Sequence, residues 1–152
     1  MVEEKGLDGH VTFTGYVPYA EVIEHLRSTE IGIVPDPSNP LNDVSTVIKA
    51  IEYMAAGRPV VGFDLKETRV SVGEAGILVS ANDDRAFAEA IRDLMDDPAR
   101  RETLGRAGRR RVETELSWER VNVNLLRMYA SLGYGRDAAE AWSGMPAGET
   151  AA

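Results

Sequence analysis

Short apolar runs alternate with segments of helical periodicity along most of this chain. Four of these runs are short, rich in β-branched residues and bounded by Gly, Pro or polar residues, which is typical of strands in a parallel sheet. They cover residues 11–14, 31–34, 59–63 and 76–79. Apolar residues at a spacing of three to four predict helices over residues 19–29, 45–56, 83–97, 98–115 and 118–132. The alternation predicts an α/β fold, with a Rossmann-like parallel sheet flanked by helices.

The helix predicted in the middle of the chain is the most informative element. A side-chain oxygen of Ser45 or Asp43 can accept from a free backbone N–H and cap this helix. Gly57 suits the left-handed conformation that often follows a helix end. At about 100° per residue, Ser45, Lys49 and Glu52 fall on one polar face. The opposite face carries the apolar residues Val47, Ile51 and Met54.

The polar face of this helix has the chemistry of an anion site. A helix N-terminus carries unpaired N–H groups and a positive partial charge. Ser45 and Thr46 add hydroxyl groups there, and Lys49 adds an ammonium. Glu52 lies about 10 Å further along than Ser45 at 1.5 Å per residue, so its carboxylate could accept from ribose hydroxyls. The alternative is an ordinary amphipathic helix whose exposed face is polar.

A family resemblance agrees with the first of these interpretations. Residues 45–61 read STVIKAIEYMAAGRPVV, which resembles the nucleotide-sugar signature of the retaining glycosyltransferases of family 4, enzymes of GT-B architecture. Weaker matches lie at residues 11–18, 31–35, 76–79 and 117–119, so the resemblance runs from about residue 7 to residue 132. It implies the C-terminal, donor-binding domain of a group 1 glycosyl transferase.

The resemblance also implies roles for individual residues. It assigns the donor diphosphate to Ser45, Thr46, Val47 and Lys49. It assigns the donor ribose to Glu52. The family motif carries a second glutamate, which would fall at Val44, a residue without a carboxylate. Asn42 and Asp43 are therefore candidates for that contact.

Loops that follow strands supply further candidates for donor-site contacts, because open α/β sheets bind ligands at the carboxyl ends of their strands. Gly15 and Tyr16 follow the first predicted strand, and the resemblance implies that this loop lies near the nucleotide base. Residues 64–73 read as another loop, in which the forked guanidinium of Arg69 could face a diphosphate. A plain turn or a solvated surface is the alternative at each of these positions.

A complete GT-B enzyme contains more than the resemblance covers here. It has an N-terminal acceptor domain, and its donor domain has a first strand and helix that we do not recognise in this chain. We expect residues 1–132 to form a partial donor-binding domain that lacks its first strands, and residues 133–152 to form a disordered tail. We expect either a piece of a larger enzyme or a short natural protein. Its bared sheet edge could associate with a second copy.

Composition excludes several other classes of function. The net charge of −8, from 17 basic and 25 acidic residues, argues against a nucleic-acid partner. Cysteine is absent, and the two histidines, His10 and His25, lie in different predicted elements, so we expect neither a metal site nor a cofactor. No apolar run approaches the roughly 20 residues that span a bilayer. We expect a cytoplasmic protein, which the missing half could bring to a membrane surface.

These observations predict the donor-binding part of a retaining glycosyltransferase of hexosyltransferase type. It would move a sugar from a nucleoside diphosphate sugar to an acceptor, for example in polysaccharide biosynthesis. We assign no catalytic residue within this chain and expect it to be inactive by itself. One alternative is a non-catalytic nucleotide-binding or regulatory module. Another is a flavodoxin-like structural domain in which Ser45, Lys49 and Glu52 only form a solvated surface.

Overall fold

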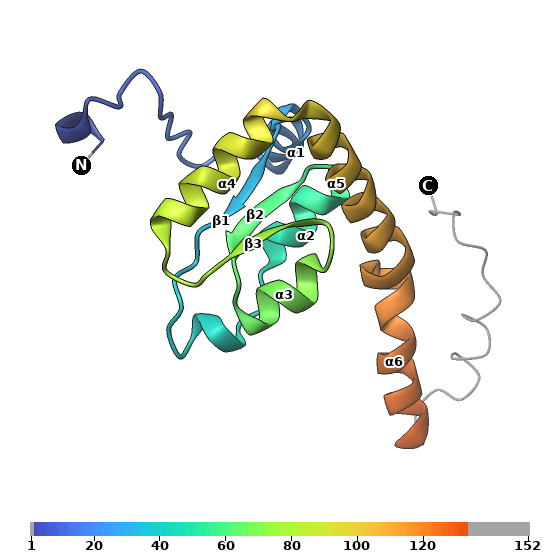
Figure 1. Cartoon of the computed structure of the whole chain (residues 1–152). Coiled ribbons are helices and arrows are strands. Elements are labelled where there is room, and N and C mark those ends of the chain that lie inside the picture. The colour runs from blue at the N-terminus through green and yellow to red at the C-terminus, as the bar shows by residue number, and fades with distance from the viewer. Residues whose placement is uncertain (1, 134–152) are drawn as a thin grey trace.

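Three parallel strands form the centre of the protein (Figure 1). The computed structural model describes residues 2–133. The strands lie in the order β1-β2-β3 and are β1 Gly32–Val34, β2 Val60–Phe63 and β3 Gly76–Val79. The helices are α1 Tyr19–Ser28, α2 Ile48–Ala55, α3 Lys66–Val72, α4 Asp84–Asp96, α5 Pro98–Arg111 and α6 Trp118–Ser131. Three shorter turns complete the elements: η1 Glu3–Lys5, η2 Asn42–Val44 and the π-helical η3 Val112–Leu116. The predicted α/β fold with a helix-flanked parallel sheet is confirmed.

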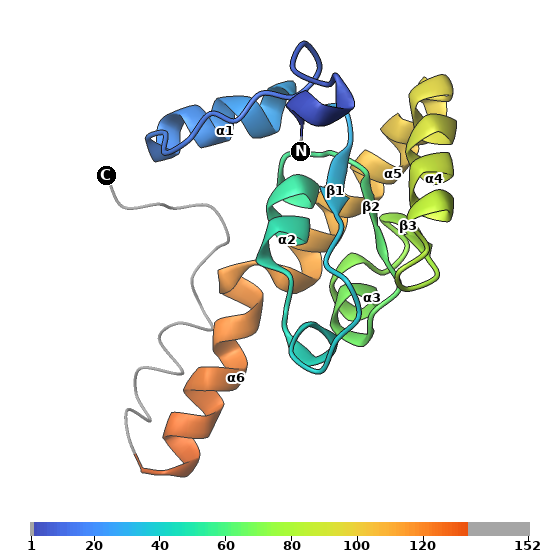
Figure 2. The ribbon, with the colours of Figure 1, turned by 90° about the vertical axis from the view of Figure 1, so that its left-hand side faces the viewer.

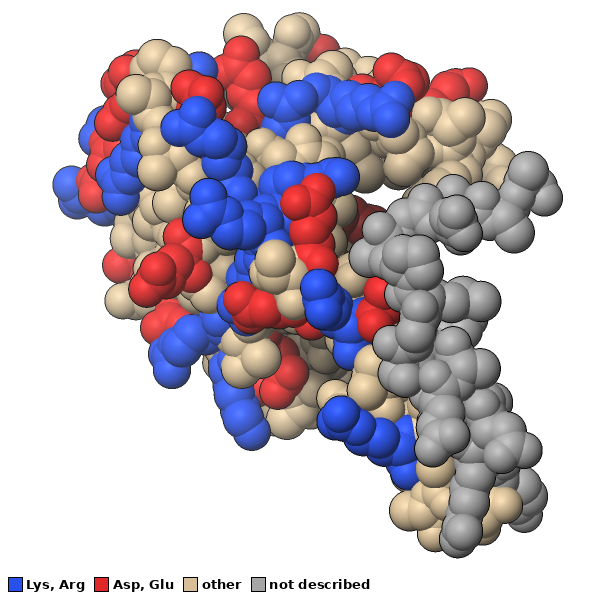
Figure 3. Space-filling model, turned by 90° about the vertical axis from the view of Figure 1, so that its right-hand side faces the viewer, with Lys and Arg blue, Asp and Glu red and all other residues tan. Residues whose placement is uncertain are grey.

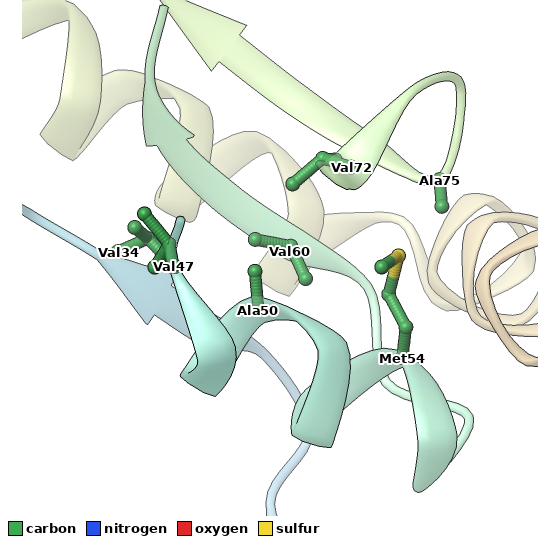
Figure 4. Close-up of a cluster of buried hydrophobic side chains, with 7 residues drawn as sticks. All are labelled: Val34, Val47, Ala50, Met54, Val60, Val72 and Ala75. Carbon is green, nitrogen blue, oxygen red and sulfur yellow. The ribbon is translucent and has the colours of Figure 1, made fainter. Parts of the chain in front are cut away.

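Helices cover both faces of the sheet. On one face, α2 and α3 pack on β1 and β2 through a cluster of buried side chains (Figure 4): Val34, Val47, Ala50, Met54, Val60, Val72 and Ala75. On the other face, α4 packs on β2 through a second cluster: Val61, Phe63, Leu65, Phe87, Ala90 and Leu94. The rings of Phe63 and Phe87 lie 5.0 Å apart in this cluster. Strand β2 is therefore buried at all four positions, which explains its unbroken apolar run.

The carboxyl end of α2 agrees with the prediction. Gly57 adopts a φ of 71°, a left-handed conformation in which a side chain would be strained. Its N–H donates to the carbonyl of Met54 at 2.9 Å, and the N–H of Arg58 donates to the carbonyl of Tyr53 at 2.9 Å. These two bonds close the helix in a Schellman motif.

The start of α2 differs from the prediction. The helix begins at Ile48, and no side chain caps it. The Ser45 hydroxyl instead donates to the carbonyl of Leu41 at 2.7 Å, and the Asp43 carboxylate accepts from the Ser38 hydroxyl at 3.0 Å. The prediction that Ser45 or Asp43 caps this helix is wrong, because both side chains form hydrogen bonds within the preceding loop.

Residues 11–14 form no strand, contrary to the prediction. They belong to a segment that leads away from the sheet (Figure 1), and Phe13 is 81% exposed. A strand needs a hydrogen-bonding neighbour, and within residues 2–133 strand β1 pairs only with β2. The segment therefore has strand composition but no strand to pair with.

Helix α3, Lys66–Val72, occupies most of residues 64–73, where a loop was predicted. Thr68, Ser71 and Val72 are buried at helical spacing where α3 packs against the sheet and α2. Two of these three buried side chains are polar, which concealed the helical period in the sequence.

The remaining helices agree closely with the prediction. The carboxylate of Asp83 accepts from the Ala86 N–H and caps α4, and Asp97 caps α5, which Pro98 opens. Ser117 precedes α6, and its side chain makes no capping bond. The carboxyl of Glu119 accepts hydrogen bonds from the backbone N–H of Glu119 and from the Ser117 side chain, and these bonds lower its pKa.

Two further expectations concern the ends of the chain and the membrane. The predicted tail, residues 133–152, lies outside the described part except for Gly133. Among residues 2–133, no helix is both long enough and apolar enough to cross a membrane.

Helix α5 approaches the turn after α2 so closely that only glycine fits. A Cβ atom on Gly105 would lie 2.2 Å from the carbonyl oxygen of Gly57. We predict that Gly105→Ala lowers the free energy of unfolding by about 1–3 kcal/mol, because the backbone must move apart. Inside an ordinary helix, the same change stabilises by about 1 kcal/mol. Urea unfolding followed by circular dichroism measures the difference.

The control for this prediction is Thr103→Ala, at an exposed position of the same helix. This change should alter the free energy of unfolding by no more than about 0.5 kcal/mol. A Gly105→Ala protein more stable than the wild type would contradict the close contact.

Candidate functional site

A small cleft lies beside the carboxyl end of β1, where the chain enters α2. Its volume is 260 Å³, and it is lined by Asp36, Asn42, Ser45, Thr46, Val47, Ile48 and Lys49. The loop after β1, the turn η2 and the first residues of α2 all contribute. The carboxyl edge of a parallel sheet is where open α/β folds bind their ligands, so the position fits a binding site.

The cleft brings together five of the residues predicted from the sequence: Asn42, Ser45, Thr46, Val47 and Lys49. Two of them are fixed by neighbours, since the Asn42 amide donates to the Pro37 carbonyl at 2.8 Å and the Ser45 hydroxyl is bound by Leu41. The side chain of Val47 is buried in the core, so only its backbone can face a ligand. Thr46 and Lys49 are exposed.

Asp36 lines the cleft but was not among the predicted site residues. Its carboxylate forms an ion pair with Lys49, with 2.8 Å between Oδ2 and Nζ. Its place two residues after β1, at the carboxyl end of a predicted strand, is the signal that could have found it. Because Asp36 already neutralises Lys49, an anionic ligand would have to compete with this carboxylate.

The free backbone N–H groups at the start of α2 lie further along the chain than the sequence predicted. The N–H of Ser45 donates to the Asn42 carbonyl at 3.2 Å, within the turn η2. The helix itself starts at Ile48, next to Lys49, and no side chain satisfies its first N–H groups. These groups and the positive end of the helix dipole lie at the cleft, since Ile48 and Lys49 both line it.

Glu52 and Asp43 lie near the cleft without lining it. Glu52 is exposed on α2, about 4.5 Å along the axis from Lys49 at 1.5 Å per residue. Asp43 belongs to η2, where it accepts from Ser38. The role predicted for Glu52 on a ribose stays a prediction.

The guanidinium of Arg69 already binds a carboxylate. Its Nε and Nη2 atoms donate to the two oxygens of Asp64, at 2.7 and 2.6 Å. Hydrogen bonds from Arg69 lower the pKa of Asp64, and the same bonds raise the pKa of Arg69. The guanidinium that was expected to face a diphosphate is therefore already bound to Asp64. Helix α3, which carries Arg69, packs beside the turn η2 near the cleft.

Gly15 and Tyr16 are separate from the cleft. Gly15 turns the chain with a φ of 63°, and Tyr16 is 98% exposed just before α1. Neither residue lines the cleft, and Figure 2 shows that their segment approaches α1 rather than the loop that precedes α2. The contact predicted for them with a nucleotide base stays untested.

A larger hollow of 670 Å³ runs along α5, beside the turn after α2. Basic and acidic side chains alternate on this side of the molecule (Figure 3). Three arginines of the hollow pair with glutamates: Arg101 with Glu30 at 3.2 Å, Arg106 with Glu102 at 2.7 Å and Arg109 with Glu113 at 2.5 Å. Its charges are largely satisfied, and it lies at the amino end of β2, away from the candidate site.

Four arginines on this side bind the last carbonyl groups of four different helices. Arg58 donates to Arg27 at the end of α1, and Arg109 donates to Ala55 at the end of α2. Carbonyls at the end of α3 accept from Arg111, and those at the end of α4 accept from Arg101, with distances of 2.6 to 3.1 Å. The basic run of α5 thus has a structural explanation, since helix ends leave carbonyls without partners.

Metal ligands are not clustered in the described part of the chain. Within residues 2–133, no group of three or more His, Asp or Glu side chains is placed to hold a metal ion. The chemistry of the cleft comes instead from hydroxyls, one ammonium, one carboxylate and the start of a helix.

The pairing of Arg69 with Asp64 predicts a change in titration. In Arg69→Gln, the pKa of Asp64 should rise toward the ordinary value of an aspartate, because the charged fork that lowers it is gone. Because the folded-state pKa is lowered, the pair stabilises the fold above the unfolded-state pKa of Asp64, and this contribution is lost as the pH falls through the folded-state pKa. NMR titration of the Asp64 carboxyl measures the change.

Arg85→Gln is the matched control for this titration, since Arg85 is an exposed arginine that pairs with a different residue, Glu89. It should leave the pKa of Asp64 unchanged. An Asp64 pKa that is the same in wild type and Arg69→Gln would contradict the assignment of its cause.

The chain is similar in sequence to known glycosyltransferases. D-inositol 3-phosphate glycosyltransferase 1 of Catenulispora acidiphila is 31% identical over 133 residues, which are 86% of this chain and 30% of that protein. Phosphatidyl-myo-inositol mannosyltransferase of Mycobacterium leprae is 33% identical over 129 residues, which are 84% of this chain and 33% of that protein. The chain thus spans about a third of the length of the curated relatives it matches.

The fold is similar to part of a solved enzyme. Sucrose-phosphate synthase from Thermosynechococcus elongatus superposes with a TM-score of 0.72 and 30% identity, over 87% of this chain and 32% of that chain. The family model of the glycosyl transferases group 1 matches residues 1–97. That match covers more than half of the sequence, so this chain belongs to the group 1 glycosyl transferases and has the fold of the C-terminal part of a GT-B enzyme.

Proposed function

We propose that this chain binds the diphosphate and ribose of a nucleotide-sugar donor, as the donor-binding part of a retaining glycosyltransferase. Family membership supports sugar transfer in general. The observation that carries the finer proposal is the cleft at the end of β1, which combines Lys49 with the uncapped start of α2.

The cleft has suitable groups for a diphosphate. The first N–H groups of α2 and the ammonium of Lys49 would face the phosphate oxygens, and the exposed Thr46 hydroxyl would add a donor. During transfer, negative charge develops on the leaving diphosphate. Preorganised donors at that position lower the barrier because they need no reorganisation as the charge appears.

Glu52 would position the donor through its ribose. An ionised carboxylate has two acceptor oxygens, which can accept from two neighbouring hydroxyls. Glu52 is exposed on the same helix, one turn beyond Lys49, so one rigid element would hold both parts of the nucleotide. Holding the donor in this way contributes orientation rather than chemistry.

The acceptor would be bound outside these residues, by the N-terminal domain expected of the whole enzyme. This chain alone would therefore bind a donor and transfer nothing. A non-catalytic nucleotide-binding module is the second candidate, because it would use the same groups of the cleft to bind a nucleotide. Transfer after addition of the N-terminal half would distinguish the two.

Calorimetric titration with uridine, guanosine and adenosine diphosphates tests the proposed donor site. We expect one nucleotide to bind, and Glu52→Ala to weaken its binding more than tenfold, or about 1.4 kcal/mol. Glu74→Ala removes an exposed glutamate away from the cleft and should leave the affinity unchanged. Binding that is equally strong in wild type and Glu52→Ala would refute the role of Glu52.

The ion pair between Asp36 and Lys49 predicts opposite effects of two substitutions. Lys49→Ala should weaken diphosphate binding, because it removes the only cation among the described residues that line the cleft. Asp36→Asn should strengthen binding, because it removes a competing carboxylate while it keeps the shape of the side chain. The same titrations measure both affinities. If Asp36→Asn weakened binding as much as Lys49→Ala does, the diphosphate would not occupy this cleft.

A further inference from the structure

One residue of the turn between β3 and α4 has a backbone conformation that side chains rarely adopt. Asn82 has a φ of 62°, and within residues 2–133 it is the only residue other than glycine with a positive φ. Glycine adopts this left-handed conformation readily, and asparagine tolerates it better than most residues. An asparagine at this position therefore supplies a side-chain amide that glycine would lack.

The side chain of Asn82 connects two loops that are distant in the sequence. Its Oδ1 atom accepts from the backbone N–H of Ser38 at 2.8 Å, although the two residues are 44 positions apart. Asn82 follows β3 and Ser38 follows β1, the strands on either side of β2, so their loops lie side by side at the carboxyl edge of the sheet (Figure 1). Because a backbone N–H only donates, this bond also fixes which way the amide of Asn82 points.

The loop of residues 37–45 is otherwise hydrogen-bonded to itself. The Ser38 hydroxyl donates to the Asp43 carboxylate at 3.0 Å, and the Asn42 amide donates to a backbone carbonyl of the same loop at 2.8 Å. Within residues 2–133, the bond to Asn82 is the only hydrogen bond that this loop forms with a residue outside it. The loop therefore holds together as a unit, and Asn82 attaches this unit to the end of another strand.

This loop forms part of the wall of the candidate cleft. Asn42 and Ser45 belong to the loop and line the cleft, whereas Lys49 belongs to α2. A shift of the loop would change the distance between these groups and the start of the helix. Asn82 itself does not line the cleft, so it can influence a ligand there only through the loop.

We propose that Asn82 is a positioning residue for the donor site, because its amide holds residues 37–45 in the place that a bound diphosphate requires. This role rests on the proposed function of the cleft. A loop that is already in place loses less conformational freedom when a ligand binds, so the bond to Asn82 raises the affinity without touching the ligand. The side chain of Asn82 is exposed and belongs to neither buried cluster, so the fold does not depend on it.

Asn82→Gly tests this role, because glycine keeps the left-handed backbone and removes only the amide. Calorimetric titration with the nucleoside diphosphate that the wild type binds should show an affinity about three- to tenfold weaker, the effect of losing one hydrogen bond. Hydrogen exchange of the Ser38 N–H, followed by NMR, should become about fivefold faster or more, because this group loses its acceptor. The melting temperature should change by less than about 2 °C, since the side chain is exposed.

Two further variants serve as controls. Asn82→Asp keeps an acceptor oxygen on a residue type that tolerates the left-handed conformation. It should restore slow exchange of the Ser38 N–H and bring the affinity closer to that of the wild type than Asn82→Gly does. Asn124→Ala removes an exposed asparagine of α6 that does not line the cleft, and it should change neither the exchange nor the affinity.

Four results would overturn the role of Asn82. Unchanged exchange of the Ser38 N–H in Asn82→Gly would mean that the amide does not hold the loop. Faster exchange with unchanged affinity would mean that the attachment is irrelevant to binding, and the proposed function would stand. Weaker binding together with a large fall in melting temperature would mean that Asn82 acts through the stability of the whole fold. A wild type that binds none of the three nucleotides would refute the proposed function, and the role of Asn82 with it.

Discussion

Burial of both faces of β2 is the constraint on which the rest of the structure depends. Val60 faces α2 and α3, while Val61 and Phe63 face α4. Both helical layers pack on this central strand, which is only four residues long, so each layer has little freedom to shift along the sheet. The loop after β1 and the start of α2 acquire their positions from this packing, and with them the candidate cleft.

The two ends of α2 differ in how firmly their backbone groups are bound. Its carboxyl end is tightly fixed: Gly57 closes the helix, Gly105 of α5 lies against the Gly57 carbonyl, and Arg109 binds the last carbonyl of the helix. Its amino end has no capping side chain. The free N–H groups thus belong to a helix that is anchored from behind, which is the arrangement that electrostatic stabilisation of an anion requires.

Helix α5 links the layers through its arginines. A run of arginines in a sequence suggests a surface for an anionic partner, but here several of them bind carbonyl groups at the ends of neighbouring helices. A guanidinium can bind two acceptors at once while its aliphatic stem covers apolar surface. The arginines of one helix can therefore supply hydrogen-bond donors to the terminal carbonyl groups of several other helices. The glutamates between these arginines pair with them and limit the local charge.

The sequence by itself determined the features that depend on neighbouring residues. The caps Asp83 and Asp97, Pro98 at the start of α5 and Gly57 at the end of α2 depend on bonds between residues a few positions apart. The group 1 motif depends only on the order of the residues. The start of α2 was decided by a competition between local bonds, since Ser45 and Asp43 bind residues four and five positions away instead of capping the helix. Only the tertiary structure decided the pair of Asp36 with Lys49, which are thirteen residues apart. It also decided that, within residues 2–133, residues 11–14 have no strand to pair with. These outcomes depend on which residues the fold brings into contact. A local pattern of apolar and polar residues shows what kind of partner a segment can bind, but not whether the fold places such a partner beside it.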